Sequence, residues 1–345
     1  MDAIALVPDL LAGRVAALAR AVSVVENGRP GFEALLAALH PRLGAAQRIG
    51  ITGPPGAGKS TLTEQLVRAY RARGERVAVV AVDPSSPFTG GALLGDRIRM
   101  ESVALDPGVF IRSMATRGSL GGLATSTGEV CDVLDAGGFS RILVETVGVG
   151  QSELDVATLA DTTVLVLVPE SGDGIQALKS GVMEVADLFV VNKADRPGAD
   201  RLAREIEVTL GIRRGNAFTR IPAHHGVSLA EAGAAPPPAE DPAAWRHPVR
   251  ATVAARGEGV DALVEDLDRH RHWMTGAGVL EARRRRRLAR RTHAVVERAM
   301  RRWVWDEARA DDRIAARMDQ VAAGRLSPYE LAAEVVQGLR EGARV

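Results

Sequence analysis

The feature that most limits how this chain can fold is a glycine-rich segment, Gly53-Pro54-Pro55-Gly56-Ala57-Gly58-Lys59-Ser60-Thr61. It matches the pattern G-x-x-x-x-G-K-[ST], follows a short apolar run at Arg48–Thr52, and opens a helical stretch. Glycines let the backbone wrap tightly and turn its N–H groups toward phosphate oxygens. The positive end of the following helix faces the same anions. We therefore expect a strand–loop–helix unit in which this whole segment contacts a bound phosphate chain.

Two side chains of this segment suit the chemistry of phosphoryl transfer. Lys59 is expected to reach the β- and γ-phosphates and to stabilise negative charge there. The Ser60 hydroxyl is expected to coordinate Mg²⁺, a hard cation that prefers oxygen ligands.

The rest of the chain predicts a parallel sheet around this unit. Continuous apolar runs fit strands that are covered on both faces. Helical patterns lie between these runs, so the alternation predicts βαβ units and an α/β fold with a doubly wound, mostly parallel sheet. The further runs are Val77–Val82, Arg141–Val144, Thr163–Val168 and Leu188–Val191.

A candidate base-reading motif, Asn192-Lys193-Ala194-Asp195, follows the last of these runs. It resembles the N-K-x-D guanine-recognition motif of GTPases. The Asp195 carboxylate can accept hydrogen bonds from the guanine ring N–H and exocyclic amino group, and adenine lacks both donors in that arrangement. The alternative is that Asp195 caps a helix. Val253-Ala254-Ala255 resembles a second base-contacting motif, with backbone contacts only, because Val253 replaces the usual serine.

Acidic residues in three further segments are candidate metal ligands. Ligands of open α/β sheets bind beyond the carboxyl ends of the strands, and Asp83 and Glu145 each end an apolar run. With Ser60 and Asp96, they are expected to organise Mg²⁺ directly or through water. The alternative for Asp83 and Asp96 is that they are solvent-exposed loop acids.

The segment after Glu145 has the form E-x-x-G, where most GTPases have D-x-x-G. Gly148 is expected to let the backbone contact the γ-phosphate and to move after hydrolysis. The group that orients the attacking water is Asp83 as first candidate and Gln151 as second.

A wider resemblance follows from these motifs. The segments GPPGAGKST, VDPSSP, GGALLGDRIRM, ETVGVGQSE and NKAD resemble the MeaB/ArgK (MMAA-type) GTPases over nearly the whole chain. The resemblance implies a SIMIBI-like P-loop GTPase fold that binds GTP or GDP with Mg²⁺. It also implies a chaperone for an adenosylcobalamin-dependent acyl-CoA mutase, above all methylmalonyl-CoA mutase, with a helical arm that forms a homodimer.

The resemblance adds one more site. A mobile segment of the family, G-D-x-x-Q-x-x-K-x-G, reads here as residues 172–181, so Gln176 and Lys179 carry over. They are expected to couple hydrolysis to the partner. The stretch Gly211–Trp245 departs from the family because it is longer than usual.

The implied organisation has three parts: an N-terminal helical extension over residues 1–45, a GTPase domain over 46–275, and a C-terminal helical dimerisation arm over 276–345. The formal net charge of +1 gives no field for nucleic acid or membrane binding. The arginine-rich run from Arg283 to Arg291 is expected to be a solvated or partner-facing helix surface, with nucleic-acid binding as the alternative. No signal peptide and no membrane-spanning apolar run is recognised, so the cytoplasm is expected.

Three other functions remain open. A nickel-delivery GTPase depends on Cys and His ligands, and Cys131 is the only cysteine. A kinase, an older label for the family, lacks a recognisable acceptor site here. The third is a binding module in which hydrolysis is incidental.

Overall fold

The computed structural model describes residues 2–83, 100–115, 122–146, 152–169, 182–213 and 244–342. The chain divides into two compact units, Met1–Arg284 and Arg285–Val345. Each unit has hydrophobic clusters of its own. No helix in the described ranges combines the length and the apolar character needed to cross a membrane.

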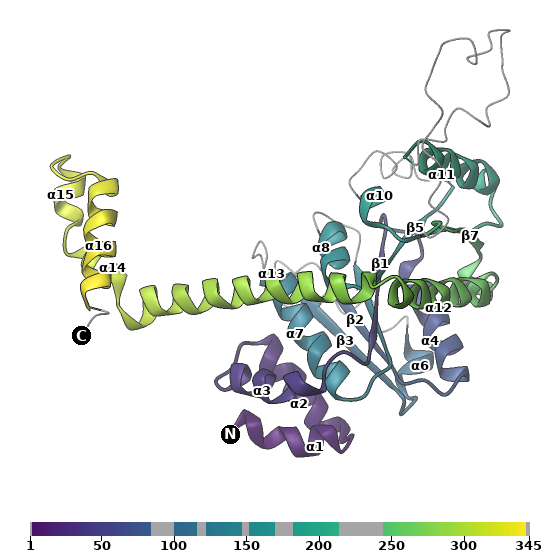
Figure 1. The fold of residues 1–345 in the computed structure, drawn as a ribbon, viewed down its shortest axis with the longest axis horizontal. Helices are drawn as coiled ribbons and strands as arrows, with labels where there is room; N and C mark the ends of the chain where they lie inside the picture. Colours follow the sequence, from purple (N-terminus) through teal and green to yellow (C-terminus); the bar gives the residue numbers. More distant parts are fainter. Residues whose placement is uncertain are drawn as a thin grey trace, which may run out of the picture. The chain divides into compact units, whose positions relative to one another are not determined.

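The first unit is built on a seven-stranded sheet with the order β3-β2-β4-β1-β5-β6-β7 (Figure 1). Every pairing between neighbouring strands is parallel. The predicted α/β fold with a doubly wound sheet is therefore confirmed. The strands are β1 (Gln47–Thr52), β2 (Val77–Asp83), β3 (Val109–Ala115), β4 (Arg141–Thr146), β5 (Thr162–Leu167), β6 (Leu188–Asn192) and β7 (Val249–Thr252).

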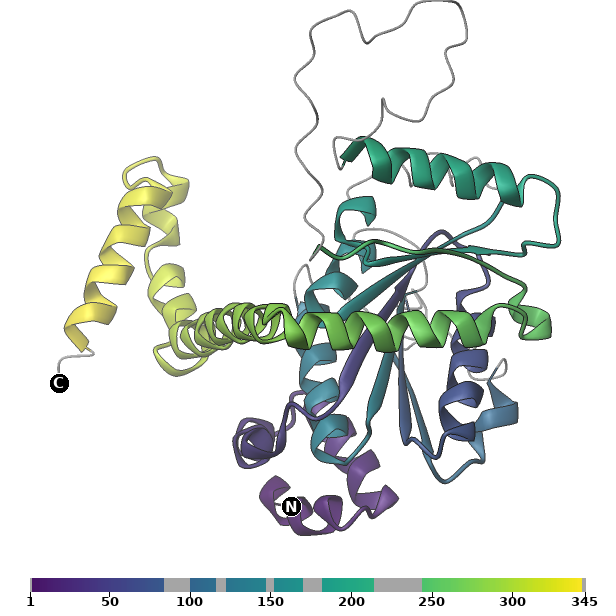
Figure 2. The ribbon, with the colours of Figure 1, turned by 45° about the vertical axis from the view of Figure 1, so that its right-hand side comes forward.

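Helices cover both faces of this sheet (Figure 2). Strand β2 shows why, because Val77 and Val79 join one apolar cluster while Ala78 and Val80 join the other. Side chains alternate along a strand, so an apolar run that is buried throughout needs helices on both sides. The helices over the sheet are α4 (Lys59–Ala72), α6 (Glu101–Ala104), α7 (Gly122–Ala136), α8 (Ser152–Leu159), α10 (Val182–Val185), α11 (Ala199–Arg213) and α12 (Val260–Gly276).

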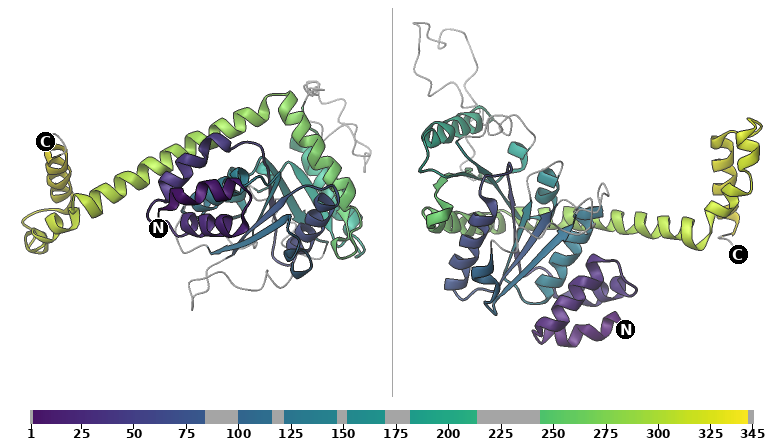
Figure 3. Two further views of the ribbon diagram at one scale, coloured as in Figure 1. Left: turned by 90° about the horizontal axis from the view of Figure 1, so that it is seen from below. Right: turned by 180° about the vertical axis from the view of Figure 1, so that it is seen from behind.

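The N-terminal helices pack against α7, as the two views of Figure 3 also show. Val22 and Leu35 from these helices share one apolar cluster with Val130 and Leu134 of α7. The segment Gly28–Pro30 separates two of these helices, and the second begins after Gly31, whose φ of 87° suits glycine. The elements are η1 (Ala3–Leu6), α1 (Val7–Leu11), α2 (Val15–Glu26), α3 (Phe32–Leu39) and η2 (His40–Arg42).

The start of α13 (Val279–Arg302) corrects the expectation for the arginine run. Arg283 donates to both Asp187 oxygens at 3.0 and 2.8 Å, and Arg284 donates to Asp161 Oδ2 at 2.8 Å. Asp161 and Asp187 are buried and precede β5 and β6. These two arginines are therefore structural ion-pair partners at the amino ends of the strands, and not part of a solvated face.

The same polar cluster contains a buried histidine. His270 is completely buried, its Nδ1 lies 2.9 Å from Thr162 Oγ1, and its ring packs against Trp245 and Trp273. Its Nε2 lies 3.5 Å from Asp187 Oδ1. Burial lowers the pKa of His270 to about 4, although the charge of Asp187 acts in the opposite direction; Arg283 and His247 add to the lowering.

This burial predicts a stability that depends on pH. Between the ordinary histidine pKa of 6.5 and the folded value of about 4, the unfolded chain takes up a proton that the folded chain does not. The free energy of unfolding should therefore fall as the pH falls through this window, by up to about 3 kcal/mol. Chemical denaturation at several pH values, for the wild type and for His270→Phe, measures the effect. The variant should show a shallower slope whatever its absolute stability, and an unchanged slope would contradict the assignment.

The second unit is helical. A small cluster of Ala310, Leu331, Val335 and Leu339 forms its core. The last helix begins with a reciprocal cap, because Glu330 N–H donates to Ser327 Oγ and Ser327 N–H donates to a Glu330 carboxylate oxygen. Its elements after α13 are η5 (Trp303–Glu307), α14 (Ala310–Ala315), α15 (Met318–Ala322) and α16 (Pro328–Gly342).

Candidate nucleotide site

The phosphate loop joins the end of β1 to the start of α4. Gly53 has a φ of 141°, and a Cβ there would lie 2.1 Å from the Val166 carbonyl oxygen. Gly58 has a φ of 84°, and a Cβ there would lie 2.4 Å from Asn192 Nδ2. Both positions therefore require glycine, and the loop wraps as closely against its neighbours as the sequence pattern predicts.

Lys59 lies inside this loop and is only 5% exposed. Its ammonium donates to the carbonyl oxygens of Gly53 at 2.8 Å and Pro54 at 2.9 Å. The loop therefore holds the ammonium at the amino end of α4, and the positive end of the helix dipole there also favours an anion.

Ser60 and Glu145 meet at the same edge of the sheet. Ser60 Oγ donates to Glu145 Oε1 at 2.6 Å, and both side chains are buried. The pairing of Ile51 with Glu145 between β1 and β4 sets this position. A hydroxyl beside a carboxylate is an oxygen donor set that fits Mg²⁺.

The remaining predicted site residues near the metal lie mostly outside the described part of the chain. Asp83 ends β2 beside β4, so its backbone lies at this edge of the sheet. Its side chain, together with Asp96, Gly148, Gln151 and Lys179, lies outside the described residues.

Asn192 connects the phosphate loop to the base-contacting segments. Its Nδ2 donates to the Ala57 carbonyl at 2.8 Å. Its Oδ1 accepts from Thr252 Oγ1 and from the Ala254 N–H, both at 3.1 Å. Asn192 is 2% exposed, so these bonds are shielded from water. The Asn192 side chain therefore bonds within the protein, and it fixes the spacing between the phosphate loop, the end of β6 and the end of β7. The role of Thr252, a buried polar residue at the end of β7, was not predicted from the sequence.

Asp195 lies at the same end of the sheet. Lys193 adopts a left-handed φ of 55°, which turns the chain after β6. The Ala194 N–H donates to the Thr252 carbonyl at 3.0 Å and fixes this turn beside β7. Because α11 begins only at Ala199, Asp195 is not the capping residue of that helix, and the capping alternative is wrong. Its carboxylate lies 3.4 Å from Arg256 Nη1.

The second predicted base segment forms the start of η4 (Ala254–Arg256). The Val253 N–H donates to the Glu258 carbonyl at 3.0 Å. The Ala254 N–H is bound to Asn192. The backbone N–H groups of Val253 and Ala254 are therefore used inside the protein. They are two of the three residues predicted to contact the base through their backbone, and Ala255 is the third.

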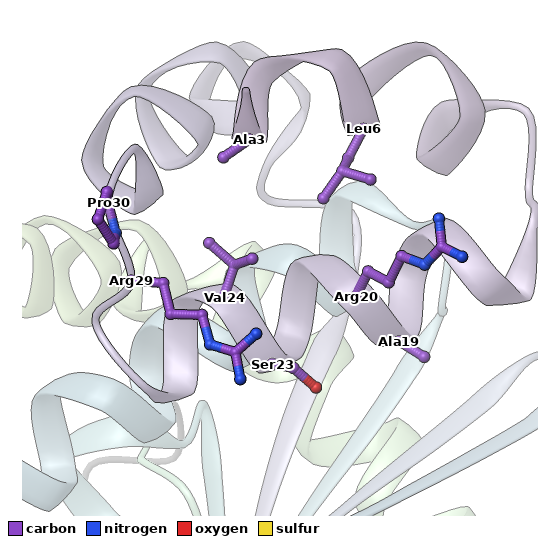
Figure 4. Close-up of a pocket in the computed structure, with 8 residues that line it drawn as sticks. All are labelled: Ala3, Leu6, Ala19, Arg20, Ser23, Val24, Arg29 and Pro30. Carbon is purple, nitrogen blue, oxygen red and sulfur yellow. The ribbon is translucent and has the colours of Figure 1, made fainter. Parts of the chain in front are cut away.

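A separate hollow of about 680 Å³ lies among the N-terminal helices (Figure 4). Arg20 and Arg29 contribute its charged groups, and Leu6 and Val24 contribute apolar ones. None of the predicted nucleotide-binding residues lines it, so it is distinct from the phosphate loop.

Comparison with known proteins identifies the family. The family model described as "Methylmalonyl Co-A mutase-associated GTPase MeaB" matches residues 18–309. This chain belongs to the MeaB family. It is a GTPase, and the resemblance seen in the sequence motifs is confirmed.

Relatives of this MeaB-family chain are found in archaea, bacteria and mammals. A "Putative GTPase" of Pyrococcus abyssi is 46% identical over 280 residues, covering 81% of this chain and 79% of its own. A "Probable GTPase" of Mycobacterium tuberculosis is 41% identical over 329 residues, covering 94% and 91%. The mouse protein "Methylmalonic aciduria type A homolog, mitochondrial" is 35% identical over 292 residues, covering 80% of this chain and 64% of its own.

The fold of this MeaB-family chain also matches a solved structure. The crystal structure of a protein named LAO/AO transport system kinase superposes with a TM-score of 0.63 at 24% identity. The match covers 98% of this chain and 97% of that one. At this identity the likeness supports the fold alone.

Proposed function

We propose that this GTPase is a chaperone for an adenosylcobalamin-dependent acyl-CoA mutase, with methylmalonyl-CoA mutase as the first candidate. GTP hydrolysis would drive cofactor loading and protection of the mutase. The observation that carries the proposal is the match over residues 18–309 to a family described by its association with that mutase. The name of the mouse relative, which refers to methylmalonic aciduria, supports it.

The chemistry proposed for the site is the transfer of the γ-phosphoryl group of GTP to water. Lys59 and the loop N–H groups stabilise charge on the γ-phosphate. Ser60 and Glu145, with Asp83 and Asp96 directly or through water, hold Mg²⁺. The metal, when bound, neutralises charge on the β- and γ-phosphate oxygens. Asp83, or else Gln151, orients the water, and Lys179 couples the reaction to the partner.

The base is read at the other end of the site. Asp195 accepts the two guanine donors, while Lys193, Val253, Ala254 and Ala255 surround the base. Asn192 supports this arrangement, since its side chain already connects Ala57 with the end of β7.

The arm, residues 276–345, is proposed to form a homodimer in the cytoplasm. The described part of the second unit exposes several large apolar side chains, which a partner surface would cover. They are Leu288, Val296, Met300, Trp305, Met318, Tyr329 and Val336.

The proposal predicts a nucleotide-dependent effect on the mutase. If methylmalonyl-CoA mutase loaded with adenosylcobalamin loses activity during turnover, addition of this protein with GTP and Mg²⁺ should slow that loss. Time courses with GTP, with GDP and without nucleotide measure the effect, and gel filtration tests for a complex. Equal time courses in all three conditions, without a complex, would contradict the mutase assignment. Transfer of labelled γ-phosphate to another molecule would support the kinase alternative instead.

A further inference from the structure

We propose that Arg256 is a positioning residue for guanine recognition. It holds the Asp195 carboxylate in the orientation that reads the base, and Glu258 in turn holds Arg256. This inference rests on the proposed role of Asp195 and deepens it.

The contacts of the Arg256 guanidinium support this arrangement. Its Nε donates to Glu258 Oε1 at 2.6 Å and its Nη2 donates to Glu258 Oε2 at 3.3 Å. This two-point contact fixes the plane of the guanidinium. The remaining nitrogen, Nη1, points to Asp195 Oδ2 at 3.4 Å. The guanidinium therefore lies between the two carboxylates and attracts Asp195 Oδ2.

The loop that carries Arg256 and Glu258 is closed on itself. Val253 and Glu258 pair as an antiparallel bridge. Gly257 and Gly259 have φ values of 74° and 77°. A Cβ at Gly259 would lie 2.3 Å from the Ala251 carbonyl oxygen, so only glycine fits at this position of the turn. The backbone therefore places Arg256 and Glu258 on one short, closed loop.

Two further hydrogen bonds tie this loop to the Asp195 turn. The Ala194 N–H donates to the Thr252 carbonyl at 3.0 Å, and the Ala254 N–H donates to Asn192 Oδ1 at 3.1 Å. Asp195 directly follows the first of these donors, and Arg256 lies just beyond the second. The two partners of the ion pair therefore sit on loops that are fixed to each other.

The ion pair is compatible with a bound base. A carboxylate offers about four lone-pair positions, and guanine needs two of them. Arg256 occupies one on Oδ2 at the long distance of 3.4 Å, which leaves room for both guanine donors. Asp195 is 40% exposed on its own side chain, so without Arg256 the carboxylate would sample other rotamers before binding. The positive charge of Arg256 also offsets the repulsion between the Glu258 and Asp195 carboxylates. Its hydrogen bond holds the pKa of Glu258 below its usual value.

The test compares nucleotides that differ only in the base. Calorimetry with Mg²⁺ gives the affinities of wild type and Arg256→Ala for GDP, IDP and ADP. Loss of an exposed ion pair should weaken GDP binding about two- to fivefold. IDP lacks the exocyclic amino group, so its affinity should fall less than that of GDP. ADP does not use the carboxylate, so its affinity should be unchanged. Glu258→Gln should also lower the affinity for GDP. Arg256→Lys should bind GDP more tightly than Arg256→Ala does. Arg201→Ala, which removes an exposed ion pair with Glu205 on α11, is the matched control.

The outcomes separate the possibilities. Selective weakening of GDP in both Arg256→Ala and Glu258→Gln supports the proposal. Tighter GDP binding would overturn it, because Arg256 would then compete with the base. Equal weakening of GDP and ADP would also overturn it, because the loop as a whole would be damaged. A wild-type protein without preference for GDP over ADP would instead remove the proposed role of Asp195, and the role of Arg256 with it.

Discussion

Replacement of Lys59 by alanine should lower the rate constant of GTP hydrolysis by about 10²- to 10³-fold. Removal of one donor that is aimed at developing charge in a water-poor site has a cost of this order. Lys59 is 5% exposed and is held inside the phosphate loop by its bonds to Gly53 and Pro54.

Phosphate release under single-turnover conditions measures this loss. Alanine favours a helix, and Lys59 is the first residue of α4, so the variant should fold and thermal unfolding can verify it. Lys59→Arg is the control that keeps the charge but changes its shape; it should remain well below the wild type, because the planar guanidinium is wider than an ammonium. Hydrolysis by Lys59→Ala within about twofold of the wild-type rate would refute the assignment.

Replacement of Asp195 by asparagine should weaken GDP and GTP binding by about 100-fold. The wild-type carboxylate would accept two charge-assisted hydrogen bonds, each worth about 1.5–3 kcal/mol. An amide of the same size removes the charge and turns one acceptor into a donor, which faces a donor of guanine. A loss near 3 kcal/mol corresponds to a change of this size.

The same variant should gain affinity for xanthosine nucleotides. Xanthine carries a carbonyl where guanine carries its exocyclic amino group, so an asparagine N–H can donate to it. Competition between GDP and XDP measures the exchange directly. Asp200→Asn, an exposed acid in the first turn of α11, is the matched control and should change nothing. If Asp195→Asn bound GDP as the wild type does, another group would have to read the base.

The sheet shows which parts of the fold the sequence reveals. The inner strands β1, β2, β4, β5 and β6 were predicted, because strands covered on both faces require continuous apolar runs. The strands that were missed, β3 and β7, lie at the two edges of the sheet. Strand β7 has only one buried residue, Thr252, and its sequence Val-Arg-Ala-Thr carries no apolar run. Edge strands therefore escape a criterion that depends on complete burial.

The candidate site divides in a similar way. The segments that are predicted to contact phosphate and base are short and local, so their spacing is visible in the sequence. The contacts that hold these segments together are not local. Asn192 binds Ala57, which lies 135 positions earlier, and Arg283 binds Asp187 across 96 positions. Such pairs leave no periodic pattern, which is why the arginines of α13 were expected to be solvated.

Asn192 has a consequence for what the protein can distinguish. Because one buried amide connects Ala57 with Thr252 and Ala254, it fixes the separation between the phosphate loop and the segments proposed to read the base. GDP and GTP share the base, the ribose and the first two phosphates, so both should dock with the same geometry there. The difference between substrate and product then has to be registered at the far end of the phosphate chain, on the side of Ser60 and Glu145. The base and the first two phosphates would thus set the affinity for both nucleotides, and the residues around Ser60 and Glu145 would distinguish GTP from GDP.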